Sequence, residues 1–180
     1  LMIFTACENK NANIPDNNNS NNNQNEYSVE DYFPVTENTK YSYTGEGNDF
    51  ATYTVFIDYI NNNKFQTRTN NGGTETIKVY EFKGNQLIEL YSRGETYFRE
   101  DFTNREFQGG KIVLKEPFAE GNTWISGKAN SKLSSLSKQV VTPRGNVNAM
   151  EITTENNQVL TIDYYAIDIG LIKTINKGEG

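Results

Sequence analysis

The sequence predicts an all-β domain, and three observations lead to that class. Residues 50–60 have a period of two, and the segments that follow them are also strand-like. Clusters of Asn and Gly separate these segments at short intervals, and no stretch of a dozen residues has helical periodicity. Connections this short join antiparallel strands, because parallel strands need long crossovers.

We therefore expect an antiparallel up-and-down meander of about ten strands. A meander of that length coils, so it should form a curved open sheet or a partly closed barrel, with at most one or two short helical turns. One such turn is expected near Ser28 and Asp31, which have the spacing of a capping box.

The first half of the meander contains the clearest strand, residues 50–60. One of its faces carries Tyr53, Val55, Ile57 and Tyr59. Four further strands are expected after Asn- or Gly-containing turns, over residues 64–70, 74–82, 86–92 and 95–102.

The second half also consists of short predicted strands separated by turns. Strands are expected over residues 111–115, 123–128, 133–142, 147–154, 158–167 and 170–176, and residues 128–138 are ambiguous between an edge strand and a loop. Residues 34–41 and 117–124 share the pattern P-x-x-E-[NG]-x-x-[YW], in which a turn leads into a strand that starts with a large aromatic residue. The repeat is compatible with two related half-sheets or with coincidence.

The N-terminal residues indicate a lipid anchor. Residues 1–7, LMIFTAC, resemble the last part of a bacterial lipoprotein signal peptide, in which small residues precede the cleavage point. We expect the Cys7 thiol to receive a diacylglycerol group with long acyl chains such as palmitate, and cleavage to leave Cys7 as the mature N-terminus. The charged start of such a peptide is missing, so we expect a fragment or a late start codon. The alternative is a free thiol near a disordered terminus.

Residues 8–26 have almost no apolar side chains, so they cannot bury enough surface to offset chain entropy. We expect a disordered Asn-rich linker that lifts the domain off a membrane. The alternative is an aggregation-prone Asn tract, which usually has interleaved aromatic residues. Residues 27–180 then form a single β domain.

Composition excludes several classes of function. The net charge of −6 argues against nucleic acid, which needs a basic surface. The chain has no His and one Cys, which excludes His- or Cys-based zinc sites, Ser-His-Asp and Cys-His catalysis, and an internal disulfide. We predict no metal and no cofactor. Residues 46–49 form an oxygen-rich loop that could hold calcium, but an ordinary polar turn is the better interpretation.

Carboxylates lie close together at Glu30-Asp31, at Glu100-Asp101, and at Asp163 with Asp168. Neighbours in a regular strand point to opposite faces, so Glu100 and Asp101 should not share one cleft. We interpret these groups as surface residues, predict no catalytic residue, and keep a glycan-cleaving enzyme as a lesser alternative.

Aromatic residues are the best candidates for ligand contacts. The possible ligand-facing set is Tyr53, Tyr59, Tyr80, Trp124 and Tyr164. Their rings could stack on sugars or line a cavity for an apolar ligand in a curved sheet. The competing interpretation is ordinary packing, because sheets are rich in Tyr for that reason alone.

Four motifs carry a family resemblance. They are residues 33–43, residues 114–117, residues 142–154 and residues 163–173. Together they resemble a family of uncharacterised lipoproteins from clostridia and related Gram-positive bacteria, some of whose members carry a downstream GerMN domain. The likeness covers nearly all of residues 31–180, although Tyr41 and Ile169 stand where Trp and Val are more common. The family has no established catalytic residues, so the resemblance implies only an extracytoplasmic, membrane-tethered domain.

The sequence thus predicts a lipoprotein domain anchored on the extracytoplasmic face of the cell membrane. Its role is expected to be non-enzymatic, as a binding or structural module of the cell envelope. The expected partners are the membrane, through the anchor, and an envelope protein or an apolar ligand. The alternative is a carrier of a lipid-like molecule in a curved β-sheet cavity.

Overall fold

The computed structural model describes residues 2–7, 27–47, 50–157 and 159–178, and these ranges confirm the all-β class. They form twelve strands and one four-residue helix, α1 (Val29–Tyr32). The strands are β1 (Met2–Cys7), β2 (Lys40–Gly45), β3 (Tyr53–Asn61), β4 (Lys64–Asn70), β5 (Glu75–Lys83), β6 (Gln86–Arg93), β7 (Lys111–Lys115), β8 (Thr123–Ser126), β9 (Ala129–Thr142), β10 (Gly145–Asn156), β11 (Val159–Ala166) and β12 (Gly170–Gly178).

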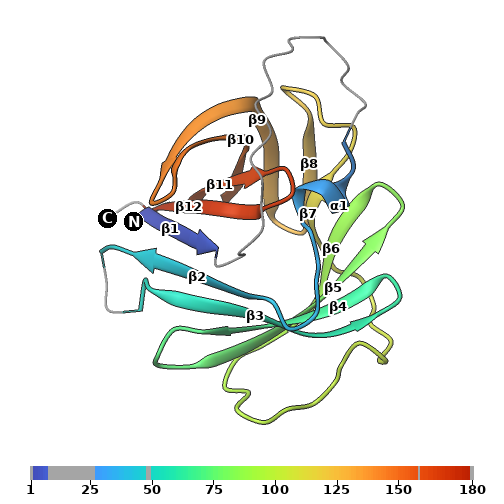
Figure 1. Cartoon of the computed structure of the whole chain (residues 1–180). Coiled ribbons are helices and arrows are strands. Elements are labelled where there is room, and N and C mark those ends of the chain that lie inside the picture. The colour runs from blue at the N-terminus through green and yellow to red at the C-terminus, as the bar shows by residue number, and fades with distance from the viewer. Residues whose placement is uncertain (1, 8–26, 48–49, 158, 179–180) are drawn as a thin grey trace.

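Strands that follow one another in the sequence pair in two antiparallel meanders. Strands β2 to β7 form the first meander, and β8 to β12 form the second. Strand β1 lies between β2 and β12 and is antiparallel to both, so the two meanders become one twelve-strand sheet (Figure 1). The up-and-down order is confirmed. Strand β1 is added by residues that the sequence interpretation assigned to a signal-peptide remnant.

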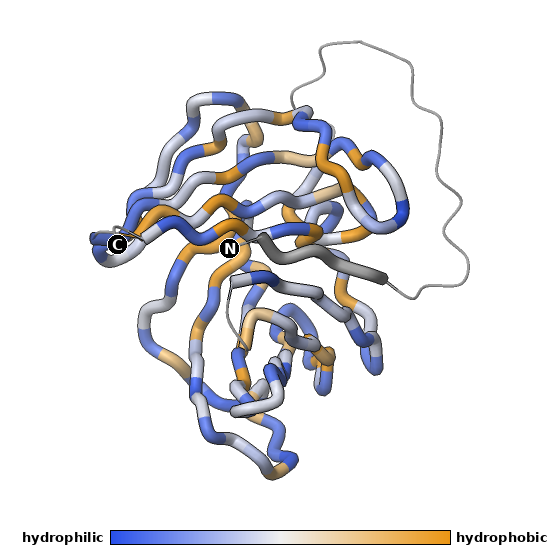
Figure 2. The backbone as a smooth tube through the Cα atoms, turned by 90° about the vertical axis from the view of Figure 1, so that its left-hand side faces the viewer, coloured by the Kyte–Doolittle hydropathy of each residue, from blue (hydrophilic) through white to orange (hydrophobic). Residues whose placement is uncertain are grey.

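The sheet curls until its two outer strands, β7 and β8, come close together. The Ile112 N–H donates to Ser126 Oγ at 2.8 Å, and the Trp124 indole N–H donates to the Ile112 carbonyl at 3.3 Å. No backbone ladder joins β7 to β8 within the described ranges, so the sheet is a partly closed barrel. Figure 2 shows hydrophilic and hydrophobic residues alternating along the strands, as expected for a sheet with one face turned inward.

The repeated sequence pattern corresponds to a repeated structure. Each copy immediately precedes the first strand of one meander, β2 or β8. Thr39 N–H donates to the Thr36 carbonyl at 3.3 Å, and at the equivalent positions Asn122 N–H donates to the Ala119 carbonyl at 3.0 Å. The fifth residue of each copy, Asn38 or Gly121, has a positive φ of 62° or 90°.

Each of these turns also contacts the second strand of its own meander in the same way. The N–H groups of Asn38 and Gly121 donate to the carbonyls of Ile57 and Leu133, which are both buried. The N–H groups of Ile57 and Leu133 donate back, at 2.9 Å each, to the carbonyls of Thr39 and Asn122. This shared arrangement favours two related half-sheets over coincidence.

The predicted strand over residues 95–102 is wrong. These residues belong to a connection between β6 and β7 that covers the outer face of the sheet. Phe102 is buried there against Ile77 and Val79, because the inward-and-outward alternation leaves apolar residues on the outer face of β5. The amide of buried Gln66 holds the connection in place, donating to the Glu100 carbonyl and accepting from the Phe102 N–H, both at 2.9 Å.

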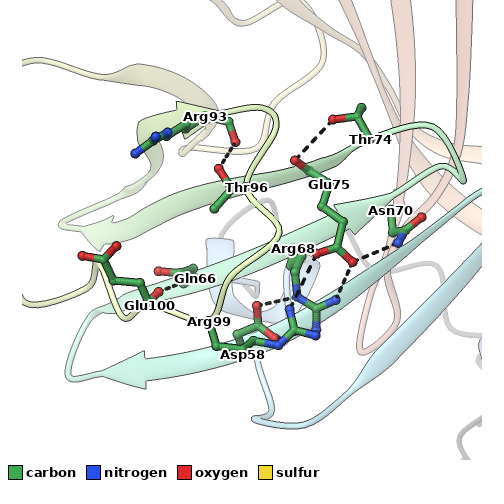
Figure 3. A network of polar contacts seen from close by, with 10 residues as sticks. All are labelled: Asp58, Gln66, Arg68, Asn70, Thr74, Glu75, Arg93, Thr96, Arg99 and Glu100. Carbon is green, nitrogen blue, oxygen red and sulfur yellow. Dashed lines mark hydrogen bonds and ion pairs between the residues drawn. The ribbon is translucent and has the colours of Figure 1, made fainter.

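A polar network lies on the same outer face (Figure 3). The Arg68 guanidinium donates to both carboxylate oxygens of Asp58, at 3.0 and 2.9 Å, and approaches Glu75 at 3.4 Å. Asn70 also donates to Glu75, and Arg99 of the connection lies 3.8 Å from it. The Arg68 and Asp58 side chains are almost fully covered, so these ion pairs fix β3, β4 and β5 under the connection.

The ambiguous residues 128–138 are strand for most of their length. They form the first part of β9, which pairs with β8 on one side and β10 on the other, so β9 is not an edge strand. The ladder with β10 has irregular register between Ala149 and Ile152, which marks a β-bulge.

The expected helical turn is α1, and it covers one part of the barrel interior. Its capping box is formed by Asp31, whose carboxylate accepts from both the backbone N–H and the hydroxyl of Ser28. Glu116 accepts from the Val29 N–H at 2.8 Å. Val29 and Tyr32 are buried in the main core, which also contains Phe65, Leu87, Leu114, Phe118, Trp124, Leu133, Met150, Ile152 and Tyr165.

Deleting residues Met2–Ala6 should destabilise the fold, because β1 is the strand that joins the two meanders. It makes three residue pairs with β12 and five with β2. At about 1 kcal/mol net per hydrogen bond, we expect the free energy of unfolding in urea to fall by several kcal/mol. Deleting five residues of the linker, 17–21, is the length-matched control. An unchanged urea midpoint after the first deletion would show that other contacts hold β2 and β12 together.

Candidate ligand-binding cavity

Part of the barrel interior is not filled by side chains. A cavity of about 410 Å³ lies next to the main core, with walls from β2 to β7, from β11 and β12, and from the segment after α1. This volume falls in the range of small-molecule sites, roughly 300–1,000 Å³. Six of the lining residues are aromatic, namely Phe33, Tyr41, Tyr43, Tyr53, Tyr80 and Tyr165.

The pleat of the strands explains which residues face the cavity. Every second residue of a strand points to the same side of the sheet. Strand β4 therefore turns Thr67 and Thr69 to the cavity, and β5 turns Thr76, Lys78 and Tyr80 to it. The residues between them, such as Arg68 and Ile77, belong to the outer face already described.

Aromatic rings form two groups in the cavity wall. The Tyr43 and Tyr53 rings, on neighbouring strands, stack with centroids 4.7 Å apart and planes 14° apart. The Phe33 ring lies 5.8 Å from Tyr80 and 6.5 Å from Tyr165, at the boundary with the main core. The cavity thus has flat apolar faces whose tyrosines also carry hydroxyl groups.

Charged side chains of β5, β6 and β7 lie side by side in the same wall. The Lys78 ammonium donates to the Glu89 carboxylate at 2.9 Å. The strand register places Tyr80 opposite Glu89, and Glu89 opposite Lys111. The Lys78 and Glu89 side chains are 35% and 17% exposed, so the pair is partly shielded from bulk water.

Asp163 brings a second carboxyl group to the cavity from β11. The hydroxyl of Thr174, its partner on β12, donates to it at 2.6 Å. Burial raises the pKa of Asp163 above its usual value, although the Thr174 hydrogen bond and the charges of Lys111 and Lys78 act in the opposite direction. Asp163 and Lys111 also border a second cavity of about 440 Å³.

Four side chains of the cavity are not activated for proton transfer, namely Tyr53, Tyr80, Tyr165 and Lys78. Burial raises the pKa of Tyr80 to about 12, and burial also raises the pKa of Tyr165 well above its usual value. Burial also raises the pKa of Tyr53, helped by Asp163. The phenol of Tyr80 and then Glu89 raise the pKa of Lys78, against the effect of its burial. At neutral pH these three tyrosines are therefore neutral hydrogen-bonding groups and Lys78 is a fixed cation.

Two of the five aromatic residues proposed from the sequence line this cavity, Tyr53 and Tyr80. Tyr59 does not, although it was expected on the same face as Tyr53 and Ile57. The ladder between β3 and β4 is irregular between Ile57 and Tyr59, which interrupts the strict alternation.

The other two proposed residues have structural contacts. Trp124 is buried in the main core, where its indole bonds to the Ile112 carbonyl. Tyr164 packs on the other side of the sheet with Val140, Ala149, Ala166 and Ile172. Tyr165, its neighbour on β11, faces the cavity instead, because successive residues of a strand point to opposite faces of the sheet.

Several cavity residues were missed by sequence reasoning. The period of two through residues 74–82 places Lys78 on the same face as Tyr80, so this residue could have been found. Glu89 and Asp163 could not, because their approach to the cavity depends on strand register and on the curl of the sheet. Phe33 lies in a short segment after α1 that has no periodicity.

The remaining sequence candidates have local roles or lie outside the described residues. Glu100 pairs with Arg105, and Asp101 accepts from Thr103 and Asn104. Within the described part of the chain, no three or more Cys, Asp or Glu residues come together in a way that could hold a metal ion. Residues 48 and 49 of the possible calcium loop, and the linker residues 8–26, lie outside that part. The backbone of Cys7 ends β1 opposite Tyr41.

Comparisons with known proteins add no identification. No family model, no curated protein and no solved structure matches the chain. The resemblance to clostridial lipoproteins therefore stays a prediction. Among the described residues, no helix is long and apolar enough to span a membrane.

Replacing Asp163 with Asn should stabilise the protein at neutral pH. The folded protein holds the Asp163 proton more tightly than the unfolded chain, whose pKa is near 3.8, so ionisation costs stability as pH rises through the folded pKa. Asn keeps an acceptor for Thr174 but cannot ionise. Thermal unfolding across pH should show a higher midpoint for Asp163→Asn at neutral pH and no difference below 3.8.

The exposed carboxylate Asp168, changed to Asn, controls for the loss of one charge. Equal midpoints for the parent and Asp163→Asn at neutral pH would mean that the ionised Asp163 is fully compensated in the fold.

Proposed function

We propose that this chain is a lipid-anchored extracytoplasmic domain that binds a small molecule in its barrel cavity and catalyses no reaction. The observation that carries the proposal is the cavity of about 410 Å³. Its lining is mostly apolar and includes a few polar groups that converge, which is typical of small-molecule sites. An unfilled interior also favours a binding role over a purely structural one.

The state of Lys78, Tyr80 and Glu89 supports binding without catalysis. A catalytic lysine or tyrosine needs a lowered pKa to act near neutral pH, whereas those of Lys78 and Tyr80 are raised. Glu89 is held by Lys78 at 2.9 Å instead of standing free as a base. The groups are thus arranged to hold hydrogen-bond partners in place.

The anchor part of the proposal rests on residues 1–7 and the linker after them. Processing before Cys7 would remove residues 2–6, which is all of β1 except its last residue. Strands β2 and β12 would then remain connected by the Tyr43 hydroxyl, which donates to the Leu171 carbonyl at 3.1 Å. The mature domain would keep every other strand, with an open position between the two meanders.

Filling the cavity should abolish ligand binding. Thr69 faces the cavity from β4, so Thr69→Phe places a ring in the space that a ligand would use. We expect the neutral fluorescent probe N-phenyl-1-naphthylamine to bind the parent and to bind Thr69→Phe at least tenfold more weakly. Thr123→Phe, at an exposed site on β8, is the matched control and should bind like the parent.

Thermal unfolding of both variants checks that the fold is kept. Equal probe binding by the parent and a folded Thr69→Phe would place the binding site elsewhere and remove the cavity from the proposal.

The anchor predicts a modified Cys7. Protein extracted from membranes of the native host should give an N-terminal peptide that starts at Cys7 and carries a diacylglycerol mass in mass spectrometry. Cys7→Ser should move the protein from the membrane fraction to the soluble fraction. An unmodified thiol on native protein would reject the anchor and leave the cavity proposal untouched.

A further inference from the structure

We propose that the cavity binds a neutral sugar, of one or two rings, in preference to a lipid, an organic cation or an organic anion. This inference rests on the proposed function, because it names the ligand class of the same cavity.

The charges around the cavity are balanced. Among its lining residues, two are cationic, Lys78 and Lys111, and two are acidic, Glu89 and Asp163. Lys78 and Glu89 neutralise each other at 2.9 Å. Lys111 is exposed to solvent and balances Asp163 when that carboxyl is ionised. A charged ligand would meet a group of its own sign in this wall, so the balance favours a neutral ligand.

The same groups disfavour a hydrocarbon chain. A lipid tail in the cavity would strip water from the Lys78–Glu89 pair and from Asp163 without offering them hydrogen bonds. Each group keeps its one protein partner, but its remaining hydrogen-bonding positions would lose water without replacement, and this cost offsets the gain from covering apolar surface. The lipid-like ligand weighed from the sequence therefore fits this cavity less well than a polar one.

Sugar rings can contact the aromatic surface of the wall and can also form hydrogen bonds with its charged groups. Their C–H faces can lie on flat aromatic surfaces such as the half-buried Tyr53 ring, which stacks on the buried Tyr43 ring. Their hydroxyl groups both donate and accept, so they can satisfy the carboxylates and the ammonium together. The hydroxyls of Thr67, Thr69 and Thr76 add further partners along the same wall.

Calorimetry with the full chain tests the ligand class. The probes are glucose, N-acetylglucosamine, maltose and N,N′-diacetylchitobiose as neutral sugars, with dodecanoate, glucuronate and choline as charged comparators. We expect at least one neutral sugar to bind at least tenfold more tightly than all three comparators, and to lose binding in Thr69→Phe but not in Thr123→Phe.

Tighter binding of dodecanoate would overturn the sugar inference while leaving the proposed function intact. Failure of all four neutral sugars, with N-phenyl-1-naphthylamine still bound, would have the same meaning. Failure of every probe would overturn both. Cleavage of a disaccharide, lost in Asp163→Asn, would keep the ligand class and replace binding by hydrolysis.

A charge variant tests the balance itself. Glu89→Gln leaves Lys78 without its carboxylate, so the wall gains a net positive charge. The affinity ratio of glucose to glucuronate should fall at least tenfold in Glu89→Gln, because glucuronate differs from glucose by a carboxylate that Lys78 can then bind. Glu155→Gln, at an exposed site on β10, should keep the parent ratio. An unchanged ratio in a folded Glu89→Gln would overturn the inference.

Discussion

The ion pair between Lys78 and Glu89 is the interaction on which the polar character of the barrel cavity depends. Both side chains point inward because the strands alternate, and their pairing offsets the cost of shielding each charge from water. The pair therefore holds two charged groups in a wall that is rich in aromatic residues. An interior lined only by apolar side chains would have no such reason to remain accessible to water or to a polar ligand.

Strand β1 is the second constraint, because it is the only link by backbone pairing between β2 and β12 in the described ranges. The proposed lipid anchor and this strand make opposite demands on residues 2–6, because processing before Cys7 would remove residues that β1 pairs with β2 and β12. Tyr43 donates to the Leu171 carbonyl and also lines the cavity, so the presence or absence of β1 should affect the position of its side chain. The stability of the connection between β2 and β12 and the shape of the cavity wall are thus linked through Tyr43.

Local signals were sufficient for the strands and insufficient for the site. Period-two alternation and Asn- or Gly-rich turns predicted most of β3 to β12, because these features act within a few residues. The connection after β6 was missed because Phe102 is held by Gln66 and the outer face of β5, which lie far away in the sequence. Asp163 was noticed as a carboxylate, but only the curl of the sheet brings it to the cavity that contains Lys78.

The repeated turn shows how one architecture can serve two purposes. Both copies start a meander with the same backbone hydrogen bonds, yet Tyr41 of the first copy lines the cavity and Trp124 of the second is buried in the core. The first meander supplies most of the polar cavity wall, and the second supplies Leu133, Met150 and Ile152 to the core. Backbone hydrogen bonds tolerate such divergence because they do not depend on the side chain. The fold can therefore stay constant while the inward residues of one half change, and it is those residues that set the chemistry of the cavity wall.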